Sequence, residues 1–349
     1  MNIPFLAAST AGSGILTWFG VWILRNHATQ LGLIDIPNER SSHTRPTPRA
    51  GGAAFVVSTI AVFLAGAAIS HQALALGIQI VLTCAMFIAI VSLADDRWRL
   101  PSRVRFAAHL IAACVVVFGA ASLVDVEWQD GMVLLLGPLG IPASILWVVG
   151  ATNIYNFMDG IDGLAGVQAV VTATAAAWIA MVRGDDMVAL LLLIVAVSVL
   201  GFLAHNWPPA KIFMGDVGSA FLGFTFAGLS LVVGGTSRGT VPFLAWVLLL
   251  SPFLFDSSVT LTRRVLRGER WHEAHREHIY QRLVRAGWSH RTVTLVYLAA
   301  DLFAASVVIA HFAYGIGSPL IAVPVATLPL AAIAGIVRHV EASRPVTAG

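Results

Sequence analysis

The chain has 349 residues, of which 58% are hydrophobic and 11% are charged, and its formal net charge is +3. Soluble domains carry about 25% charged residues. The composition therefore excludes a soluble globular protein and favours a polytopic membrane protein. Both cysteines, Cys84 and Cys114, lie inside apolar runs, which argues against a disulfide framework.

Eleven apolar stretches are long enough to cross a bilayer as helices, which takes about 20 residues each. In chain order they lie at 4–24, 51–70, 73–94, 104–124, 136–153, 164–182, 187–204, 219–235, 241–262, 292–312 and 319–337. The first exceeds a signal-peptide core and has no basic residue before it, so we interpret it as a retained helix. The fifth is the weakest, because prolines and a glycine interrupt its start. We predict an all-α, polytopic integral membrane protein with about eleven transmembrane helices in a single domain, 1–349.

Basic residues divide the connecting loops into two groups. The loops at 25–50, 95–105, 153–166, 205–218 and 263–291, with the tail after 337, hold 19 of the 21 Lys and Arg residues. The other loops are short and plain. Because cytoplasmic loops are rich in Lys and Arg, we expect the N-terminus outside and the C-terminus in the cytoplasm. Every motif-like stretch then lies on the cytoplasmic face.

The stretch 153–166 reads N-I-Y-N-F-M-D-G-I-D-G-L-A-G, with Asn153, Asn156, Asp159 and Asp162 at three-residue spacing. This spacing keeps side chains on one face if the segment is helical. Carboxylates at the edge of a membrane segment are costly without compensation, so they indicate a cation or a polar ligand. The alternative is a polar loop of turn residues.

Asp95 and Asp96 are adjacent at the end of an apolar run, and four arginines follow between positions 97 and 105. Adjacent carboxylates repel each other unless a cation lies between them or basic groups surround them. Such a pair suits Mg²⁺, which prefers oxygen ligands and shares them with substrate phosphates. The alternative is a charge cluster at a helix end.

Two loops add groups suited to a nucleotide. In 25–50, His43 and Arg49 belong to a basic cluster that can bind phosphate oxygens, although anionic lipid headgroups would suit it equally. In 205–218, Asp216 lies between glycines where a helix opens, and the amide end of a helix favours anions. Phe213 can stack on a nucleobase or fill a core position.

The loop at 263–291 contains W-H-E-A-H-R-E-H-I-Y-Q-R-L-V-R. Ile279 and Leu283 at four-residue spacing predict a short amphipathic helix on the membrane face. We expect its polar side to carry His275, Arg276, His278 and Arg282. Two histidines at three-residue spacing could bind zinc, but phosphate binding is the preferred interpretation.

These groups are the components of phosphoryl transfer between a nucleotide-linked donor and an acceptor dissolved in lipid. Two other classes remain. A secondary transporter of an anionic metabolite would place ionisable groups near the bilayer midplane, where only Asp256 and Asp301 fall within apolar runs. An inactive scaffold of the same fold is the other, and the intact aspartates argue against it.

The chain resembles the polyprenyl-phosphate N-acetylhexosamine-1-phosphate transferases over nearly its whole length. The matching stretches are G-L-I-D-I-P-N-E-R-S-S-H…P-R-A-G-G, A-D-D-R, N-I-Y-N-F-M-D-G-I-D-G-L-A-G and N-W-P-P-A-K-I-F-M-G-D-V-G-S. The resemblance implies a bacterial inner-membrane enzyme that moves a sugar-1-phosphate from a UDP-sugar of N-acetylhexosamine type to undecaprenyl phosphate and releases UMP. The reaction would initiate O-antigen or a related polysaccharide. It implies Mg²⁺, with Mn²⁺ as a substitute, a lipid surrounding and no nucleic acid, and leaves a homodimer open.

The resemblance also assigns residues. Asp95 and Asp96 match paired catalytic aspartates that position or deprotonate the lipid phosphate. Asp216 matches a magnesium ligand, and Asn156 aligns with an asparagine that can share the metal. The substrate-binding candidates, from the resemblance and the basic loops together, are Asp159, Asp162, Asn206, Phe213, His43, Arg49, His275, Arg276 and His278.

One departure from the family concerns the last cytoplasmic loop, which usually carries a denser cluster of the form H-I-H-H or H-H-H. Here the first histidine, His278, is kept, and Tyr280 and Gln281 replace the following pair. This pattern resembles the O-antigen-initiating subgroup more than the peptidoglycan branch. It leaves the identity of the sugar open.

Overall fold

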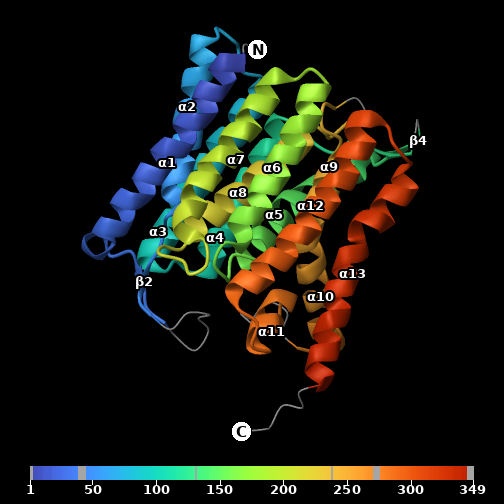
Figure 1. The fold of residues 1–349 in the computed structure, drawn as a ribbon. Coiled ribbons are helices and arrows are strands. Elements are labelled where there is room, and N and C mark those ends of the chain that lie inside the picture. The colour runs from blue at the N-terminus through green and yellow to red at the C-terminus, as the bar shows by residue number, and fades with distance from the viewer. Residues whose placement is uncertain (1–2, 38–44, 130–131, 237–238, 270–275, 344–349) are drawn as a thin grey trace.

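The computed structural model describes residues 3–37, 45–129, 132–236, 239–269 and 276–343. In this part of the chain the protein is a bundle of helices with two small two-stranded sheets (Figure 1). Eight described helices are long and apolar enough to cross a membrane, and a bent pair would make nine. The all-α polytopic fold is confirmed, whereas about eleven crossings stays a prediction.

Every predicted apolar stretch coincides with helical structure. In chain order the helices are α1 (Ile3–Leu31), α2 (Gly52–Ile69), α3 (Leu76–Trp98), α4 (Ser102–Gly119), α5 (Gly140–Phe157), α6 (Leu164–Val182), α7 (Asp186–Asn206), α8 (Asp216–Val232), α9 (Phe243–Leu249), α10 (Ser251–Leu266), α11 (Ile279–Arg285), α12 (His290–Tyr314) and α13 (Pro319–Ser343). α11 is the short helix predicted in the last loop, and Ile279 and Leu283 are buried as its pattern requires.

The strands are short and antiparallel. β1 (Ile34–Asp35) pairs with β2 (Thr47–Pro48) inside the first long loop. β3 (Asp125–Gln129) pairs with β4 (Met132–Leu135), and a 3₁₀ turn, η1 (Gly137–Leu139), leads into α5. The segment after 124, expected to be a plain loop, is therefore part of a hairpin, which its alternating apolar residues favour once a partner strand is available.

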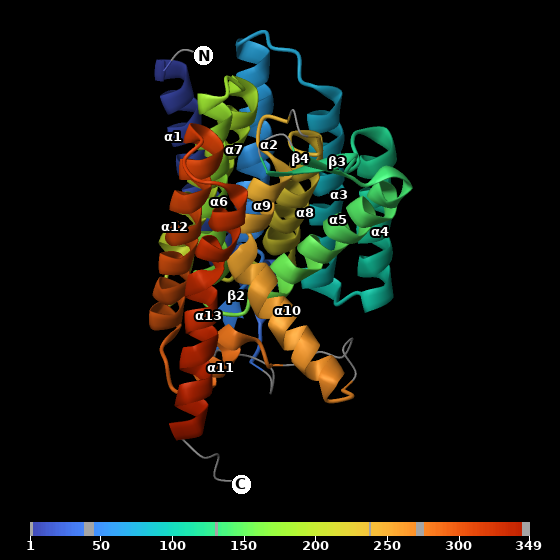
Figure 2. The same cartoon turned by 90° about the vertical axis from the view of Figure 1, so that its right-hand side faces the viewer.

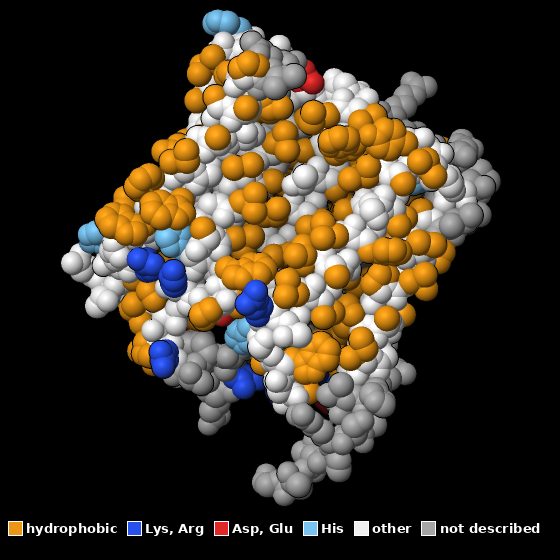
Figure 3. Space-filling view, viewed as in Figure 1, with side chains coloured by type: hydrophobic (Ala, Val, Ile, Leu, Met, Phe, Trp, Pro, Cys, Tyr) orange, Lys and Arg blue, Asp and Glu red, His pale blue; other side chains and the backbone are white. Residues whose placement is uncertain are grey.

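The two ends of the bundle differ in what they carry. α1 starts at one end and α13 finishes at the opposite end, where the loops with the sequence motifs also gather (Figure 1). Lys and Arg side chains lie towards this motif-bearing end, below a broad hydrophobic surface (Figure 3). This arrangement agrees with alternating loops and with the predicted separation of charge.

α8 forms the centre of the bundle, and every residue from Val217 to Leu231 is buried. It packs against α3 and α5, and α6 and α7 pack against each other beside α1 and α12 (Figure 2). An apolar helix enclosed on all sides is covered by protein and not by lipid. Its 17 residues are therefore sufficient, although they are fewer than a lipid-exposed span requires.

The backbones of α2 and α8 touch at Gly52 and Gly218. A Cβ atom added at Gly52 would overlap the Gly218 backbone, so the crossing requires glycine. Next to it, the N–H groups of Gly51 and Gly52 donate to the carbonyls of Phe213 and Met214, each at 2.9 Å. The first loop and the loop before α8 are thus joined through their backbones.

The ninth predicted stretch, 241–262, is wrong as a single helix. α9 and α10 meet at 70°, because Pro252 in the first turn of α10 has no N–H to continue the helix of α9. α10 leads away from the bundle at its motif-bearing end (Figure 2). One face carries exposed Leu261, Val265 and Leu266, and the other carries buried Asp256.

Candidate active site

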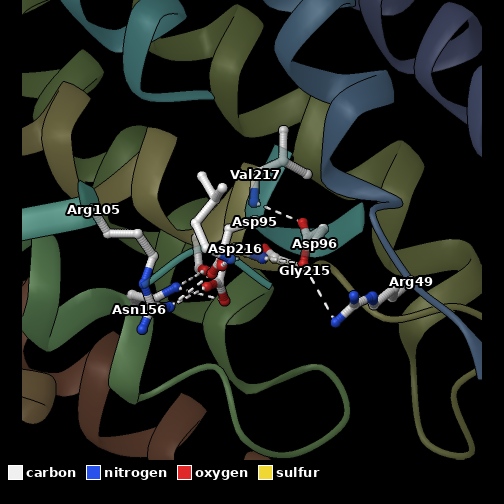
Figure 4. A network of polar contacts seen from close by, with 10 residues as sticks. Arg49, Asp95, Asp96, Arg105, Asn156, Gly215, Asp216 and Val217 are labelled. Carbon is white, nitrogen blue, oxygen red and sulfur yellow. Dashed lines mark hydrogen bonds and ion pairs between the residues drawn. The ribbon is translucent and has the colours of Figure 1, made fainter. Parts of the chain in front are cut away.

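Asp95 and Asp96, which end α3, meet the start of α8 at the motif-bearing end of the bundle (Figure 4). Asp96 is 3% exposed, and its carboxylate accepts hydrogen bonds from the N–H groups of Asp216 at 3.2 Å and Val217 at 3.1 Å. The amide end of α8, predicted to favour an anion, therefore holds a carboxylate of the protein itself. Asp96 fixes where α8 begins and hence where Asp216 lies.

Asp95 faces a different partner. Its Oδ1 accepts from the Leu100 N–H at 2.6 Å, and its Oδ2 accepts from Arg105 Nη1 at 2.8 Å. Arg105 is on α4, beyond the turn that follows α3. The two adjacent aspartates therefore have different surroundings. Asp96 is bound by the N-terminus of a helix, and Asp95 is bound by a guanidinium.

Asp216 lies beside Asp95 and shares its counter-ion. Arg105 Nη1 donates to Asp216 Oδ2 at 2.9 Å, and the Asn156 amide nitrogen donates to Asp216 Oδ1 at 3.0 Å (Figure 4). Asn156 also donates to Ser219 Oγ at 2.9 Å. The structure therefore brings together Asp95, Asp96, Asp216 and Asn156, as the sequence predicted. Asn156 presents its amide nitrogen, and not its oxygen, to Asp216.

The four polar residues of the 153–166 stretch do not share one helical face. α5 ends at Phe157, so Asn153 and Asn156 are helical, whereas Asp159 and Asp162 lie in the loop before α6. Burial and the negative charges of Asp216, Asp96 and Asp162 raise the pKa of Asp159 well above its usual range. This accumulation of negative charge favours a cation at the site.

Asp162 and Asn206 hold loops together. Burial alone would raise the pKa of Asp162, but hydrogen bonds from His290 (3.2 Å) and the Ala210 N–H (3.0 Å) outweigh it and lower the pKa. Asn206 is buried, accepts from the Gly163 N–H and donates to the Ile212 carbonyl, each at 2.9 Å. Both side chains therefore hold the loops in position, and their contact with substrate stays a prediction.

Arg49 is the basic residue of the first loop that reaches the site. Its Nη1 lies 3.9 Å from Asp96 Oδ1, and its Nε is buried with no hydrogen-bond partner among the described residues. A guanidinium with an unused buried N–H is suited to a phosphate oxygen. Phe213 and Arg276 are half-buried, while His43 and His275 lie outside the described residues.

The last loop differs from the prediction. His278 and Arg282 are not on a polar outer side but are buried, at 4% and 7% exposure. His278 caps α11, and its Nδ1 lies 3.1 Å from Asp256 Oδ1. A helix whose N-terminus is anchored to the interior turns these positions inward, which hydrophobic spacing alone does not reveal.

Asp256 was missed as a structural centre. Its carboxylate accepts hydrogen bonds from the N–H groups of Ile279 (2.8 Å) and Tyr280 (3.1 Å) and from Tyr297 Oη (2.6 Å). Tyr280 is fully buried, donates from Oη to the Phe157 carbonyl at 3.1 Å, and packs so closely on Gly160 that a Cβ there would overlap it. The tyrosine that replaces a histidine of the family pattern thus joins α11 to the end of α5.

The acidic groups fit a divalent cation that is shared with substrate. Asp95 and Asp216 direct oxygens to one point, and Mg²⁺ commonly uses one or two carboxylates and completes its shell with water and phosphate. Among the described residues no three His, Cys, Asp or Glu side chains form a ready metal site. The protein would therefore supply part of the ligand set and the substrate the rest.

The sequence matches known proteins over most of its length. The profile of glycosyl transferase family 4 matches residues 78–234. A Bacillus subtilis protein named probable undecaprenyl-phosphate N-acetylglucosaminyl 1-phosphate transferase is 32% identical over 82% of this chain and 80% of its own. Decaprenyl-phosphate N-acetylglucosaminephosphotransferase of Mycobacterium tuberculosis is also 32% identical, over 84% and 80%. Undecaprenyl-phosphate alpha-N-acetylglucosaminyl 1-phosphate transferase of Escherichia coli K12 is 28% identical, over 90% and 86%. The chain belongs to glycosyl transferase family 4.

Proposed function

We propose that this member of glycosyl transferase family 4 transfers N-acetylglucosamine-1-phosphate from UDP-N-acetylglucosamine to undecaprenyl phosphate and releases UMP. The names of its relatives support the sugar phosphate and the polyprenyl acceptor. The product would begin a cell-surface polysaccharide in the bacterial cytoplasmic membrane.

The observation that carries the proposal is the meeting of Asp95, Asp96 and Asp216 with Arg49 and Arg105 at one end of an apolar bundle. A lipid phosphate reaches such a place from the bilayer, and a nucleotide reaches it from water. The predicted transporter has less support, because Asp256, one of its two candidate carboxylates, holds α11 in place.

In the proposed step an oxygen of the lipid phosphate attacks the β-phosphorus of the UDP-sugar. The bond from that phosphorus to the bridging oxygen breaks, and UMP leaves with the electron pair. The products are undecaprenyl-diphosphate-sugar and UMP. Mg²⁺, held by Asp216 and Asp95, would supply positive charge where negative charge develops on the pyrophosphate.

The side chains of this protein have separable tasks. Asp95 lies beside Asp216, where it can share the metal and orient the lipid phosphate. Asp96 positions α8 and Asp216 through two backbone N–H groups. Arg49 has a spare buried N–H for a phosphate oxygen. Phosphoryl transfer depends chiefly on such positioning and charge neutralisation.

The test uses purified full-length protein in detergent with undecaprenyl phosphate and a panel of UDP-sugars, and it measures UMP and the lipid-linked product. We expect UMP with UDP-N-acetylglucosamine, loss of the reaction in EDTA and recovery with Mg²⁺ or Mn²⁺. Uptake of intact UDP-sugar into proteoliposomes, with no UMP formed, would contradict the transferase and support a transporter.

The same proposal requires the site to face the cytoplasm, where UDP-sugars are present. We expect a reporter fused after Asp130 to be external and a reporter at the C-terminus to be cytoplasmic, because 19 of 21 basic residues lie in the motif-bearing loops and tail. A cytoplasmic reading after Asp130 would contradict this topology.

A further inference from the structure

Arg105 occupies an unusual position among the charged groups of the site. A single nitrogen, Nη1, lies 2.8 Å from Asp95 Oδ2 and 2.9 Å from Asp216 Oδ2. One donor atom therefore bridges two carboxylates that come from α3 and α8. This bridging point is where a cation shared by the two carboxylates would also lie.

The guanidinium is held loosely at this point. About a third of the side chains of Arg105 and Asp216 is exposed, at 36% and 33%. Arg264 provides a contrast, because its side chain is 8% exposed and its Nη1 contacts Glu269 at 3.0 Å and Glu277 at 2.7 Å. Arg105 is therefore more open to solvent than Arg264, but its closer partner Asp95 is only 10% exposed, so the two carboxylates need another cation when Arg105 leaves.

The other arginine at the site does not bridge carboxylates. Arg49 Nη1 lies 3.9 Å from Asp96, and the oxygens of Asp96 already accept two backbone N–H groups. Within the described residues, the ion pairs of Asp95 and of Asp216 both come from Arg105. Arg105 thus bridges two carboxylates, whereas the neighbouring Arg49, which has the same charge, does not.

We propose that Arg105 is the resident counter-ion of Asp95 and Asp216, and that a divalent metal binds by displacing its guanidinium. The inference rests on the proposed function only in taking the metal to be Mg²⁺ or its substitute Mn²⁺. Once displaced, the guanidinium is free on the exposed side of the site, where a substrate phosphate can receive it. Arg105 therefore neutralises charge on the two carboxylates without metal and adds positive charge beside the metal when it is bound.

The first experiment measures Mn²⁺ binding to the full-length protein in detergent, without substrate, from the electron paramagnetic resonance signal of free Mn²⁺. When the Arg105 guanidinium occupies the site most of the time, the apparent affinity for Mn²⁺ falls in proportion to the fraction of protein in which the site is open. Arg105→Gln should therefore bind Mn²⁺ about tenfold more tightly. Asp216→Asn should lose this binding.

Matched controls separate displacement from a general effect of charge. Arg103→Gln removes an exposed charge from the same helix, and Arg49→Gln removes a neighbouring charge that does not bridge. Arg103→Gln should stay within about twofold of the unmodified protein, because charge acting from solvent is screened. Arg49→Gln should gain less than Arg105→Gln, because Arg49 lies near Asp96 and forms no bridge between Asp95 and Asp216. Equal gains in all three variants, no gain in Arg105→Gln, or no Mn²⁺ binding at all would overturn the proposal.

A second experiment follows the guanidinium directly. Arginine-specific labelling with phenylglyoxal, read at Arg105 by mass spectrometry, should increase when Mn²⁺ is added, while labelling of Arg103 should stay unchanged. Protection of Arg105 by Mn²⁺ would contradict displacement. Neither experiment contains UDP-sugar or lipid phosphate, so a failed exchange and a failed transferase reaction, measured by UMP, are distinguishable.

Discussion

Two carboxylates of this protein, Asp256 and Asp216, bear the same charge in very different surroundings. Asp256 is 1% exposed, and five donors meet its two oxygens, from Thr260, His278, Ile279, Tyr280 and Tyr297. Asp216 is about one-third exposed and accepts hydrogen bonds from the side chains of Arg105 and Asn156, which lie on two other helices.

The difference indicates what each carboxylate can do. A buried carboxylate whose oxygens are fully used by fixed donors is a structural anchor, because any ligand would have to replace several hydrogen bonds at once. A partly exposed carboxylate with one arginine and one amide can exchange partners. Residue type and membrane depth alone do not make this distinction, since both residues are aspartates in apolar surroundings.

The largest effect is expected from Asp216→Asn. We expect UMP release to fall by about 10³-fold or more, because the change removes charge where the reaction needs it. The melting temperature in detergent should change little, since the amide can still accept hydrogen bonds. Asp125→Asn, on β3 away from the site, is the control. Substantial UMP release by Asp216→Asn at saturating Mg²⁺ would remove it from the metal role.

Asp256→Ala should mainly affect stability, unlike Asp216→Asn, which should mainly affect activity. The change leaves several buried donors without an acceptor, and we expect a loss of about 3 kcal/mol or more in the free energy of unfolding. Asp256→Asn, which keeps an acceptor oxygen, should lose less. Thermal unfolding in detergent checks both variants. Unchanged stability of Asp256→Ala would show that Asp256 is not the anchor we describe.

Asp95 and Asp96 sharpen the comparison within one pair. Asp95→Asn and Asp96→Asn should each lower the rate at least about tenfold, equivalent to about 1.4 kcal/mol of barrier. Only Asp96→Asn should also lower the melting temperature, because Asp96 binds the N-terminus of α8. UDP-sugar binding, measured by calorimetry, should change less than turnover in Asp95→Asn. Identical behaviour of the two variants would contradict the division of roles.

The smallest effect is expected from Tyr280→Phe. The variant loses the hydrogen bond from Oη to the Phe157 carbonyl, which should cost about 1 kcal/mol in stability. Tyr280→His would place the residue of the family pattern at this position and tests whether the tyrosine selects the sugar. Its donor preference among UDP-sugars should stay unchanged, because Tyr280 is fully buried. A changed preference would return this position to substrate recognition.

The sequence predicted the helices well because a long run of hydrophobic residues marks a helix in this protein, whether the helix faces lipid or is buried. It did not predict the 70° break between α9 and α10, since Pro252 alone does not reveal whether a helix bends or ends. Nor did it predict that β3 and β4 form a hairpin. That outcome depends on the pairing of two short segments and not on the composition of either one.

Sequence reasoning identified four residues that meet at the candidate site, but it did not predict their contacts. Charge and spacing identified Asp95, Asp96, Asn156 and Asp216, which the structure brings together. The partnership with Arg105 depends on the turn between α3 and α4, which no periodicity encodes. Asp159 and Asp162 were placed with the asparagines by spacing, whereas α5 ends before them. His278 was expected at the surface, because its anchor Asp256 is 22 residues away.

The contact of Gly52 with Gly218 has a mechanical consequence. Arg49 lies in the loop before α2, and Asp216 begins α8. The backbone contact between these helices and the hydrogen bonds beside it make α2 and α8 one rigid unit. Arg49 and Asp216 would therefore keep their separation when substrate binds.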